Sequence, residues 1–196
     1  MSNSENLKLT ISKSPVRRAL AMVEFSTVSS GITALDIITK AAAVDILAAQ
    51  TICPGKYMIL FCGGLGAVKA ALEAARPVPN VIDEFVLGRP HLSIFAALSG
   101  TVVLPKKTAL GLIETFSGAA AIEAADTAAK ASWVNLAEIR IAHGMCGKST
   151  VMFTGDVAAV TAALEAAKKE ASDKGMLLDT ALIPNPDDKM LAALAK

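Results

Sequence analysis

The sequence has almost no excess of charge of either sign. Its 19 Lys and Arg residues against 18 Asp and Glu leave a formal net charge of +1. A balance this close gives no field that would attract a nucleic acid or an anionic membrane surface. We therefore expect neither of these partners.

Long apolar segments are also missing. The charge-free stretch 57–68 is shorter than the roughly 20 residues that cross a bilayer, and Gly63, Gly64 and Gly66 interrupt it. Residues 1–18 are polar and lack the apolar core of a secretory signal. These features predict a cytosolic protein without a transmembrane helix.

Catalytic motifs and a disulfide framework are absent as well. An odd number of cysteines, three in all, argues against structural disulfides and leaves buried thiols, metal ligation or redox chemistry. There is no phosphate-binding loop, nucleophile elbow or HExxH motif, and the glycines at 63–66 fall short of a dinucleotide fingerprint. We expect a protein that is not an enzyme.

Apolar residues and alanine are plentiful instead. The chain is 53% hydrophobic, with a mean hydropathy of +0.50, and much of this is alanine. This composition favours close-packed helices and more apolar surface than a small monomer can bury. We expect an obligate oligomer.

The most informative feature is an internal repeat. Residues 19–44 align without a gap on residues 109–134, so that Glu24 corresponds to Glu114 and Lys40 to Lys130, 90 residues later. The offset becomes 92 at the Gly-Lys pairs and 96 near the ends, where Pro90 corresponds to Pro186. Insertions of this size are expected in loops, and chance does not explain the match.

Each copy has the same predicted elements: a strand, an alanine-rich helix, two strands, a second helix, a final strand and a helical tail. In the second copy Asp156 is the predicted N-cap of the second helix. This order predicts an α/β fold, an α+β sandwich used twice. We expect a flexible N-terminal extension over 1–18, a first domain over 19–105 and a second over 106–196, joined near the turn and breaker residues Ser99, Gly100 and Pro105.

The second copy carries a series of motifs in the order of a known domain: 113–115 (IET), 117–118 (SG), Asp126, Lys130, 147–148 (GK), 155–156 (GD) and 184–186 (PNP). The chain thereby resembles the tandem-domain, trimer-forming shell proteins of bacterial microcompartments, over residues 20–194. Residues 51–56 (TICPGK) resemble the loop of the iron–sulfur-binding kind from propanediol-utilization compartments.

The resemblance implies a structural protein of a microcompartment shell in the cytoplasm. It implies a pseudo-hexameric homotrimer that meets other shell proteins edge to edge, with an encapsulated redox enzyme as a further partner. The loops before the Gly-Lys pairs then surround a central pore, lined by Cys53, Pro54, Gly55, Met145, Cys146 and Gly147. Independently of the family, two near-equivalent domains need only threefold symmetry to close a six-part ring.

Cys53 is the leading metal-ligand candidate. Taken alone, it is either a small residue in a turn or a thiol that threefold symmetry would bring together with two copies of itself. The resemblance matches it to the ligand of an iron–sulfur cluster, a 4Fe-4S cluster shared by three chains, for electron or cluster transfer across the shell. Three thiolates leave one of the usual four positions to another ligand.

Cys146 is a weaker candidate. It aligns with Pro54, one position beyond Cys53, and either adds a second ring of thiols or is simply a small loop residue, which we favour. Cys62 lies in an apolar strand, and we expect it in the core. A trimer without a cluster, whose centre is a metabolite pore, is the alternative function, and a small signalling or ligand-binding protein is a third.

Lys40 and Lys130 follow the first helix of each copy. A lysine there is often an ordinary solvated residue favoured by the helix dipole, whereas the resemblance places it at the tile edge, with Arg89 as a companion. Lys56 and Lys148 either line the pore or point back into the domain. Glu24 and Glu114 could be read as a catalytic carboxylate pair. Because the repeat makes them equivalent, we expect instead that each has the same structural role in its own copy.

Overall fold

The structure is a computed structural model that describes residues 19–99, 104–105, 108–142 and 144–194. These residues form two copies of one α+β arrangement, as predicted from the repeat. By packing they form two compact units, one containing 19–90 with the described part of 142–147, the other containing those of 91–141 and 148–194. The predicted extension 1–18 and residue 106, where the second domain is predicted to begin, lie outside the described residues.

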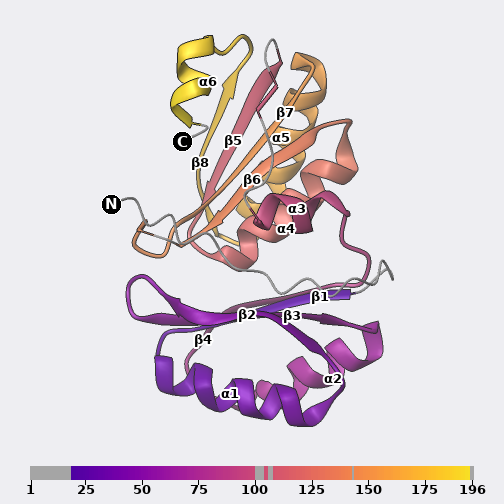
Figure 1. The fold of residues 1–196 in the computed structure, drawn as a ribbon, viewed down its shortest axis with the longest axis vertical. Coiled ribbons are helices and arrows are strands. Elements are labelled where there is room, and N and C mark those ends of the chain that lie inside the picture. Colours follow the sequence, from indigo (N-terminus) through magenta and orange to yellow (C-terminus); the bar gives the residue numbers. More distant parts are fainter. Residues whose placement is uncertain (1–18, 100–103, 106–107, 143, 195–196) are drawn as a thin grey trace. The chain divides into compact units, whose positions relative to one another are not determined.

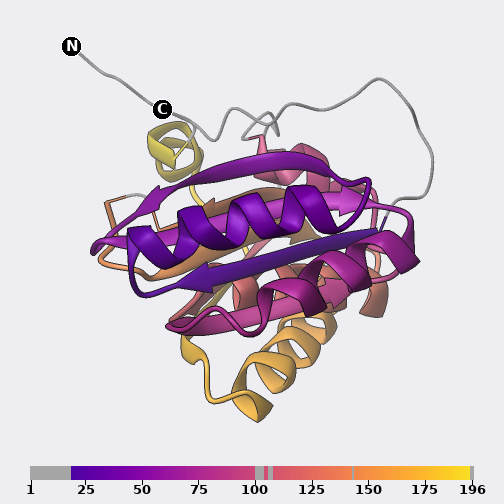
Figure 2. The ribbon, with the colours of Figure 1, turned by 90° about the horizontal axis from the view of Figure 1, so that it is seen from below.

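The first copy contains β1 (Ala19–Phe25), α1 (Val28–Ala41), β2 (Asp45–Ile52), β3 (Lys56–Gly63), α2 (Leu65–Ala75), β4 (Val81–Leu87) and α3 (Ser93–Leu98). Its strands form an antiparallel sheet in the order β2-β3-β1-β4. Helices α1 and α2 lie side by side on one face of that sheet (Figures 1 and 2). The core between them contains Val23, Phe25, Ile59 and Phe61.

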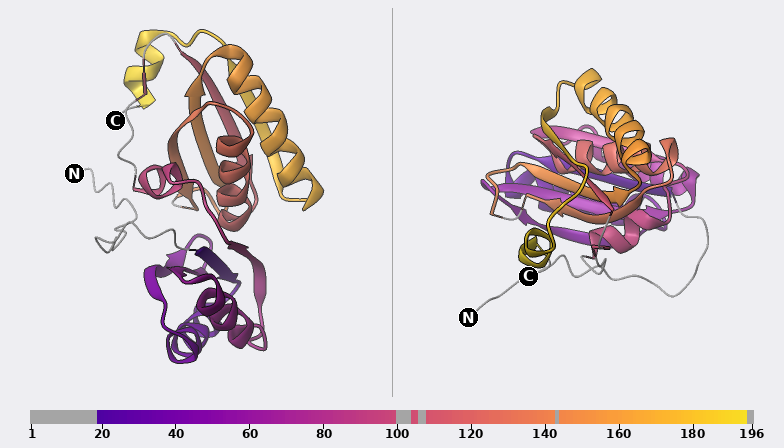
Figure 3. Two further views of the ribbon diagram at one scale, coloured as in Figure 1. Left: turned by 90° about the vertical axis from the view of Figure 1, so that its right-hand side faces the viewer. Right: turned by 90° about the horizontal axis from the view of Figure 1, so that it is seen from above.

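The second copy contains β5 (Ala109–Thr115), α4 (Gly118–Ala131), β6 (Asn135–Ile141), β7 (Ser149–Gly155), α5 (Val157–Asp173), β8 (Leu177–Ile183) and α6 (Asp188–Leu194). The sheet order, β6-β7-β5-β8, repeats that of the first. Figure 3 shows α4 and α5 together on one face of this sheet. Helix α3, which the repeat assigns to the first copy, packs on β6 and α4 of the second unit.

Local sequence explains where the helices begin. Thr27 and Ser117 occupy the equivalent N-cap positions, and their hydroxyls accept the backbone N–H of Ser30 and Ala120 at 3.4 and 3.0 Å. Such caps satisfy an otherwise unpaired donor of the first turn. Asp156 is at the N-cap of α5 as predicted, although its side chain makes no capping hydrogen bond.

One interior contact differs between the copies in a complementary way. In the first copy Gly31 of α1 lies against the Tyr57 ring of β3, and a Cβ added at Gly31 would come within 2.3 Å of that side chain. The corresponding residues of the second copy are Ala121 and Ser149, a larger helix residue opposite a smaller strand residue. The repeat therefore fills the same space in two ways, as dense packing requires.

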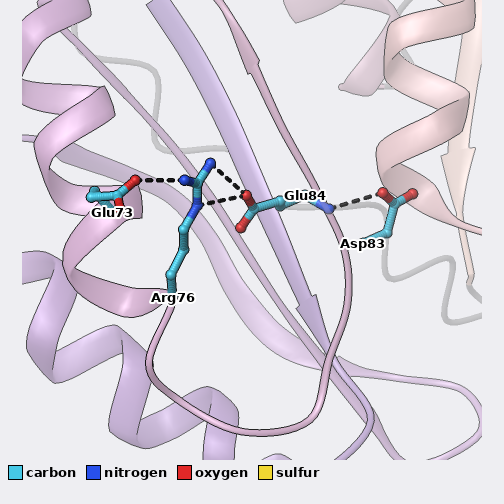
Figure 4. Close-up of polar contacts among 4 residues, drawn as sticks. All are labelled: Glu73, Arg76, Asp83 and Glu84. Carbon is cyan, nitrogen blue, oxygen red and sulfur yellow. Dashed lines mark hydrogen bonds and ion pairs between the residues drawn. The ribbon is translucent and has the colours of Figure 1, made fainter.

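A polar network joins the end of α2 to β4 (Figure 4). The Arg76 guanidinium donates to Glu73 at 2.6 Å and to Glu84 at 3.0 Å, and the Asp83 carboxylate accepts the Glu84 backbone N–H. The network is largely solvent-exposed, so it contributes little to stability. It links the end of α2 to β4 across the turn between them.

Equivalent surfaces of the two copies differ sharply in exposure. Ile122 of α4 is fully buried, whereas the corresponding Ile32 of α1 is 54% exposed. The same contrast separates the two tail helices, because Leu98 of α3 is buried and its counterpart Leu194 of α6 is 39% exposed. The chain thus covers these positions of α4 and α3 and leaves the corresponding positions of α1 and α6 exposed to solvent.

No helix in the described part of the chain combines the length and the apolar character that crossing a membrane requires.

Candidate metal site and assembly surfaces

Cys53 lies at the tip of the hairpin between β2 and β3. Because β2 ends at Ile52 and β3 begins at Lys56, only Cys53, Pro54 and Gly55 make the turn. All three are exposed, and Gly55 has a φ of +75°, which glycine adopts without strain. The predicted candidate ligand is therefore a solvent-accessible thiol on a short, tightly defined loop.

The corresponding loop of the second copy approaches Cys53. A Cβ added at Gly147 would lie 3.3 Å from the Cys53 carbonyl oxygen and 3.3 Å from Lys56 Nζ, so Gly147 lies beside the Cys53 backbone and the Lys56 side chain within one unit. Cys146 is exposed and Met145 is half-buried. Six predicted pore residues therefore lie on two neighbouring loops, and their place around a pore stays a prediction.

Lys56 points back into the first unit. Its Nζ lies 3.7 Å from the Glu24 carboxylate, and the two side chains are 17% and 0% exposed. Of the two roles that the sequence left open, the structure places Lys56 as the partner of a buried carboxylate. The second copy differs, since Lys148 is exposed and Glu114 is only half-buried, so the two glutamates do not share one environment.

The thiols of one chain cannot complete an iron–sulfur cluster. Cys62 is 4% exposed and lies in the core as predicted, which leaves Cys53 and Cys146 accessible. Such a cluster takes four ligands, normally thiolates. The donor set thus fits a cluster only where several chains bring their Cys53 thiols together.

Among the described residues, no three or more His, Cys, Asp and Glu side chains are grouped in a way that could hold a metal ion within one chain.

The predicted edge lysines have different surroundings. Lys40 is 74% exposed and its Nζ lies 2.7 Å from the Asp36 carboxylate, which is 60% exposed. Lys130 pairs with Asp126, whose side chain is 6% exposed and also accepts the backbone N–H of His91 at 2.7 Å. Asp126 therefore anchors the segment that leads into α3, as well as holding the lysine.

Two further residues, Arg89 and Trp133, are on the surface. Arg89 is exposed, and its role at the tile edge stays a prediction. Trp133, which follows α4, is 97% exposed, and the repeat did not single it out because its counterpart in the first copy is Ala43. Large apolar side chains are usually at least partly covered, so Trp133 marks this end of α4 as unusual.

Comparison with known proteins decides the family. The family model of the BMC domain matches residues 19–90 and again residues 109–186. The chain belongs to the BMC domain family. It is a tandem BMC domain protein, and the resemblance inferred from the motifs is confirmed.

Curated relatives support the assignment along nearly the full length. The bacterial microcompartment shell protein PduT of Citrobacter freundii is 37% identical over 175 residues, 88% of this chain and 95% of that protein. The carboxysome assembly protein CcmO of Synechococcus elongatus is 29% identical over 81% of this chain and 62% of its own length. These relatives are named as shell and assembly proteins, which confirms the prediction of a protein that is not an enzyme.

Solved structures show the same BMC arrangement. A microcompartment protein from Desulfitobacterium hafniense superimposes with a TM-score of 0.79 at 44% identity, covering 88% of this chain and 97% of that one. A fused, permuted hexameric shell protein of the RMM microcompartment gives a TM-score of 0.63 at 23% identity, covering 82% and 86%. The second likeness concerns the fold alone.

Proposed function

We propose that this tandem BMC protein is a structural component of a bacterial microcompartment shell in the cytoplasm, where three chains close a pseudo-hexagonal tile with an iron–sulfur cluster at its centre. The tile meets other shell proteins at its edges. A cluster held there would serve electron transfer across the shell, with an encapsulated redox enzyme as the partner. The observation that supports the three-chain ring is the unequal exposure of equivalent surfaces in the two copies.

The outer face of helix α1 is the surface on which we place a second chain. The matching face of α4 buries Ile122 completely, whereas Ile32 is 54% exposed. Asp126, 6% exposed, accepts a backbone N–H, and its counterpart Asp36 is 60% exposed. Because the two copies are the same domain, the segment that packs on α4 within the chain has an equivalent segment in the other copy. That equivalent segment can pack on α1 of a neighbouring chain.

The two tail helices supply the complementary surface. Helix α3 packs on α4 and β6 and buries Ile94, Ala97 and Leu98. At the corresponding positions of α6, Met190 is half-buried and Ala193 and Leu194 are exposed. Packing of α6 on α1 and β2 of the next chain repeats the α3 contact, and such a head-to-tail contact closes a ring where the rotation permits it.

Threefold closure gives Cys53 its role. Each chain contributes one Cys53 thiol on an exposed loop, and a threefold axis near that loop brings three of them together. A cluster bound there supplies a redox centre whose potential depends on its ligands and on solvent exposure. The protein's part is to hold the three thiolates, with Pro54 and Gly55 fixing the turn that presents them.

The test is iron binding by protein reconstituted without oxygen. We expect about four iron atoms per three chains for the wild type, since a 4Fe-4S cluster is shared, with visible absorbance and an EPR signal after reduction. Cys53→Ser loses iron and signal, and Cys62→Ala, which changes only a core thiol, keeps both. Iron retained by Cys53→Ser would contradict the assignment. A trimeric wild type without iron would leave the metabolite pore as its function.

The edge assignment makes a separate prediction. Replacing Lys40 and Lys130 together by Ala is expected to leave the trimer intact in size-exclusion chromatography while abolishing ordered sheets in electron micrographs. Sheets form by many weak contacts between tiles. The loss of one charged contact per domain recurs at every edge, so its destabilising effect adds up across the sheet. The matched control replaces Lys69 and Lys168, two other exposed lysines, and keeps the sheets. Ordered sheets from the Lys40/Lys130 variant would count against the edge role.

A further inference from the structure

Two of the three cysteines lie exposed on loops that touch. Cys53 and Cys146 are both accessible, whereas Cys62 is buried. The residue after Cys146 is Gly147, whose Cβ position lies 3.3 Å from the Cys53 carbonyl oxygen. Adjacent Cα atoms are about 3.8 Å apart. Cys146 is therefore one residue away from the position at which its loop lies beside Cys53.

Open space lies beside both loops. Gly55 and Gly144, which lie two residues from Cys53 and Cys146, each have positive φ, and a Cβ added at either would meet nothing within 4 Å. Cys146 itself has a φ of +52°, a left-handed conformation that is unfavourable for a non-glycine residue. Strain of this kind favours movement of the loop when a new bond compensates for it.

We infer that Cys53 and Cys146 of one chain form a reversible dithiol–disulfide pair. A disulfide needs Cα atoms about 4.4–6.8 Å apart, so the pairing requires the Cys146 loop to bring the two Cα atoms within that range. This inference deepens the proposed function, because a closed pair would withdraw Cys53 from the cluster. Cys146 is then the residue that makes cluster assembly sensitive to the thiol redox state.

The oxidant is a low-molecular-weight disulfide such as oxidised glutathione. The thiolate of one cysteine attacks that disulfide, forms a mixed disulfide and releases one reduced thiol. The thiolate of the other cysteine then attacks the protein sulfur of the mixed disulfide and releases the second reduced thiol. Two protein thiols are thereby oxidised to one disulfide, and one external disulfide is reduced to two thiols.

Trypsin separates the three cysteines, which makes the pairing measurable. Cleavage after lysine and arginine places Cys53 on peptide 41–56, Cys62 on 57–69 and Cys146 on 141–148. Metal-free native protein is incubated with oxidised glutathione, alkylated, and digested without reduction. We expect a cross-linked 41–56/141–148 peptide in mass spectra, monomeric mobility in denaturing gels, and a fall from two reactive thiols per native chain to none.

Matched variants decide whether this pair is specific. Cys62→Ala keeps the cross-link, and Cys53→Ser and Cys146→Ser each abolish it while retaining the wild-type circular dichroism. Persistent free thiols in the wild type, or disulfide-linked dimers in place of the internal cross-link, would overturn the inference.

Cluster assembly separates this inference from the proposed function. Wild-type protein oxidised beforehand is expected to take up less than about a tenth of the iron of reduced protein, and Cys146→Ser the full amount after the same treatment. A cross-link in a protein that never binds iron contradicts the cluster and leaves the thiol pair standing. Iron uptake that is unaffected by the 53–146 cross-link contradicts the regulatory role of Cys146.

Discussion

Gly31→Ala is expected to lower the free energy of unfolding of the first unit by about 3 kcal/mol, the upper part of the range for overpacked cores. The added Cβ would lie 2.3 Å from Tyr57 Cδ1 and 2.5 Å from Tyr57 Cβ. The Tyr57 Cβ is fixed by the β3 backbone, so a rotation of the ring cannot relieve the overlap. Urea denaturation followed by far-UV circular dichroism measures the loss.

Two further variants make this prediction specific. Gly66→Ala is the control, because Gly66 is also helical but has open space around its Cβ position, so alanine there is expected to be neutral or stabilising by up to about 1 kcal/mol. The Gly31→Ala/Tyr57→Ser double variant recreates the Ala121/Ser149 pair of the second copy. It should be more stable than the sum of the two single effects predicts. Equal effects of the two glycine substitutions would refute the packing argument.

Ile32→Asp is expected to dissociate the proposed trimer. Burying an isoleucine fully contributes about 1.5–3 kcal/mol, and the introduced carboxylate adds the cost of removing a charge from water. A loss of about 3 kcal/mol at each interface weakens that interface by about 100-fold. Size-exclusion chromatography with light scattering over a dilution series measures the mass.

Thr33→Asp provides the matched control for Ile32→Asp. Thr33 is the next residue of α1 and is also exposed, but helical geometry turns its side chain about 100° away from that of Ile32. We expect Thr33→Asp to remain trimeric at concentrations where Ile32→Asp is monomeric. If both variants stay trimeric, the outer face of α1 is not the interface, and a monomeric wild type would refute the ring itself.

The sequence predicted the fold closely because the repeat was strong. Two aligned copies revealed the same order of strands and helices, and a local signal, the N-cap at Asp156, located the start of α5. The core position of Cys62 followed from the apolar strand that contains it, and the turn at Cys53 followed from the two strands that flank it. These features depend on short-range pattern and chain order, which a sequence displays directly.

Several features of the candidate site did not follow from the sequence. Lys56 and Lys148 are equivalent in the repeat, yet Lys56 pairs with the buried Glu24 while Lys148 is exposed. No local signal predicted that Gly147 lies against Cys53, because the two residues are 94 positions apart. Such differences arise from long-range packing that the alignment of two copies does not contain.

The sequence by itself determined that one domain is used twice, where its elements begin, and which residue types stand at each loop. Only the tertiary structure decided which copy of each surface is covered, as with Ile122 and Ile32, and which loops meet, as with those of Cys53 and Cys146. The physical reason is that burial and contact depend on segments distant in the chain. Identical local patterns therefore acquire different environments, and those differences give this chain its candidate interface and its thiol pair.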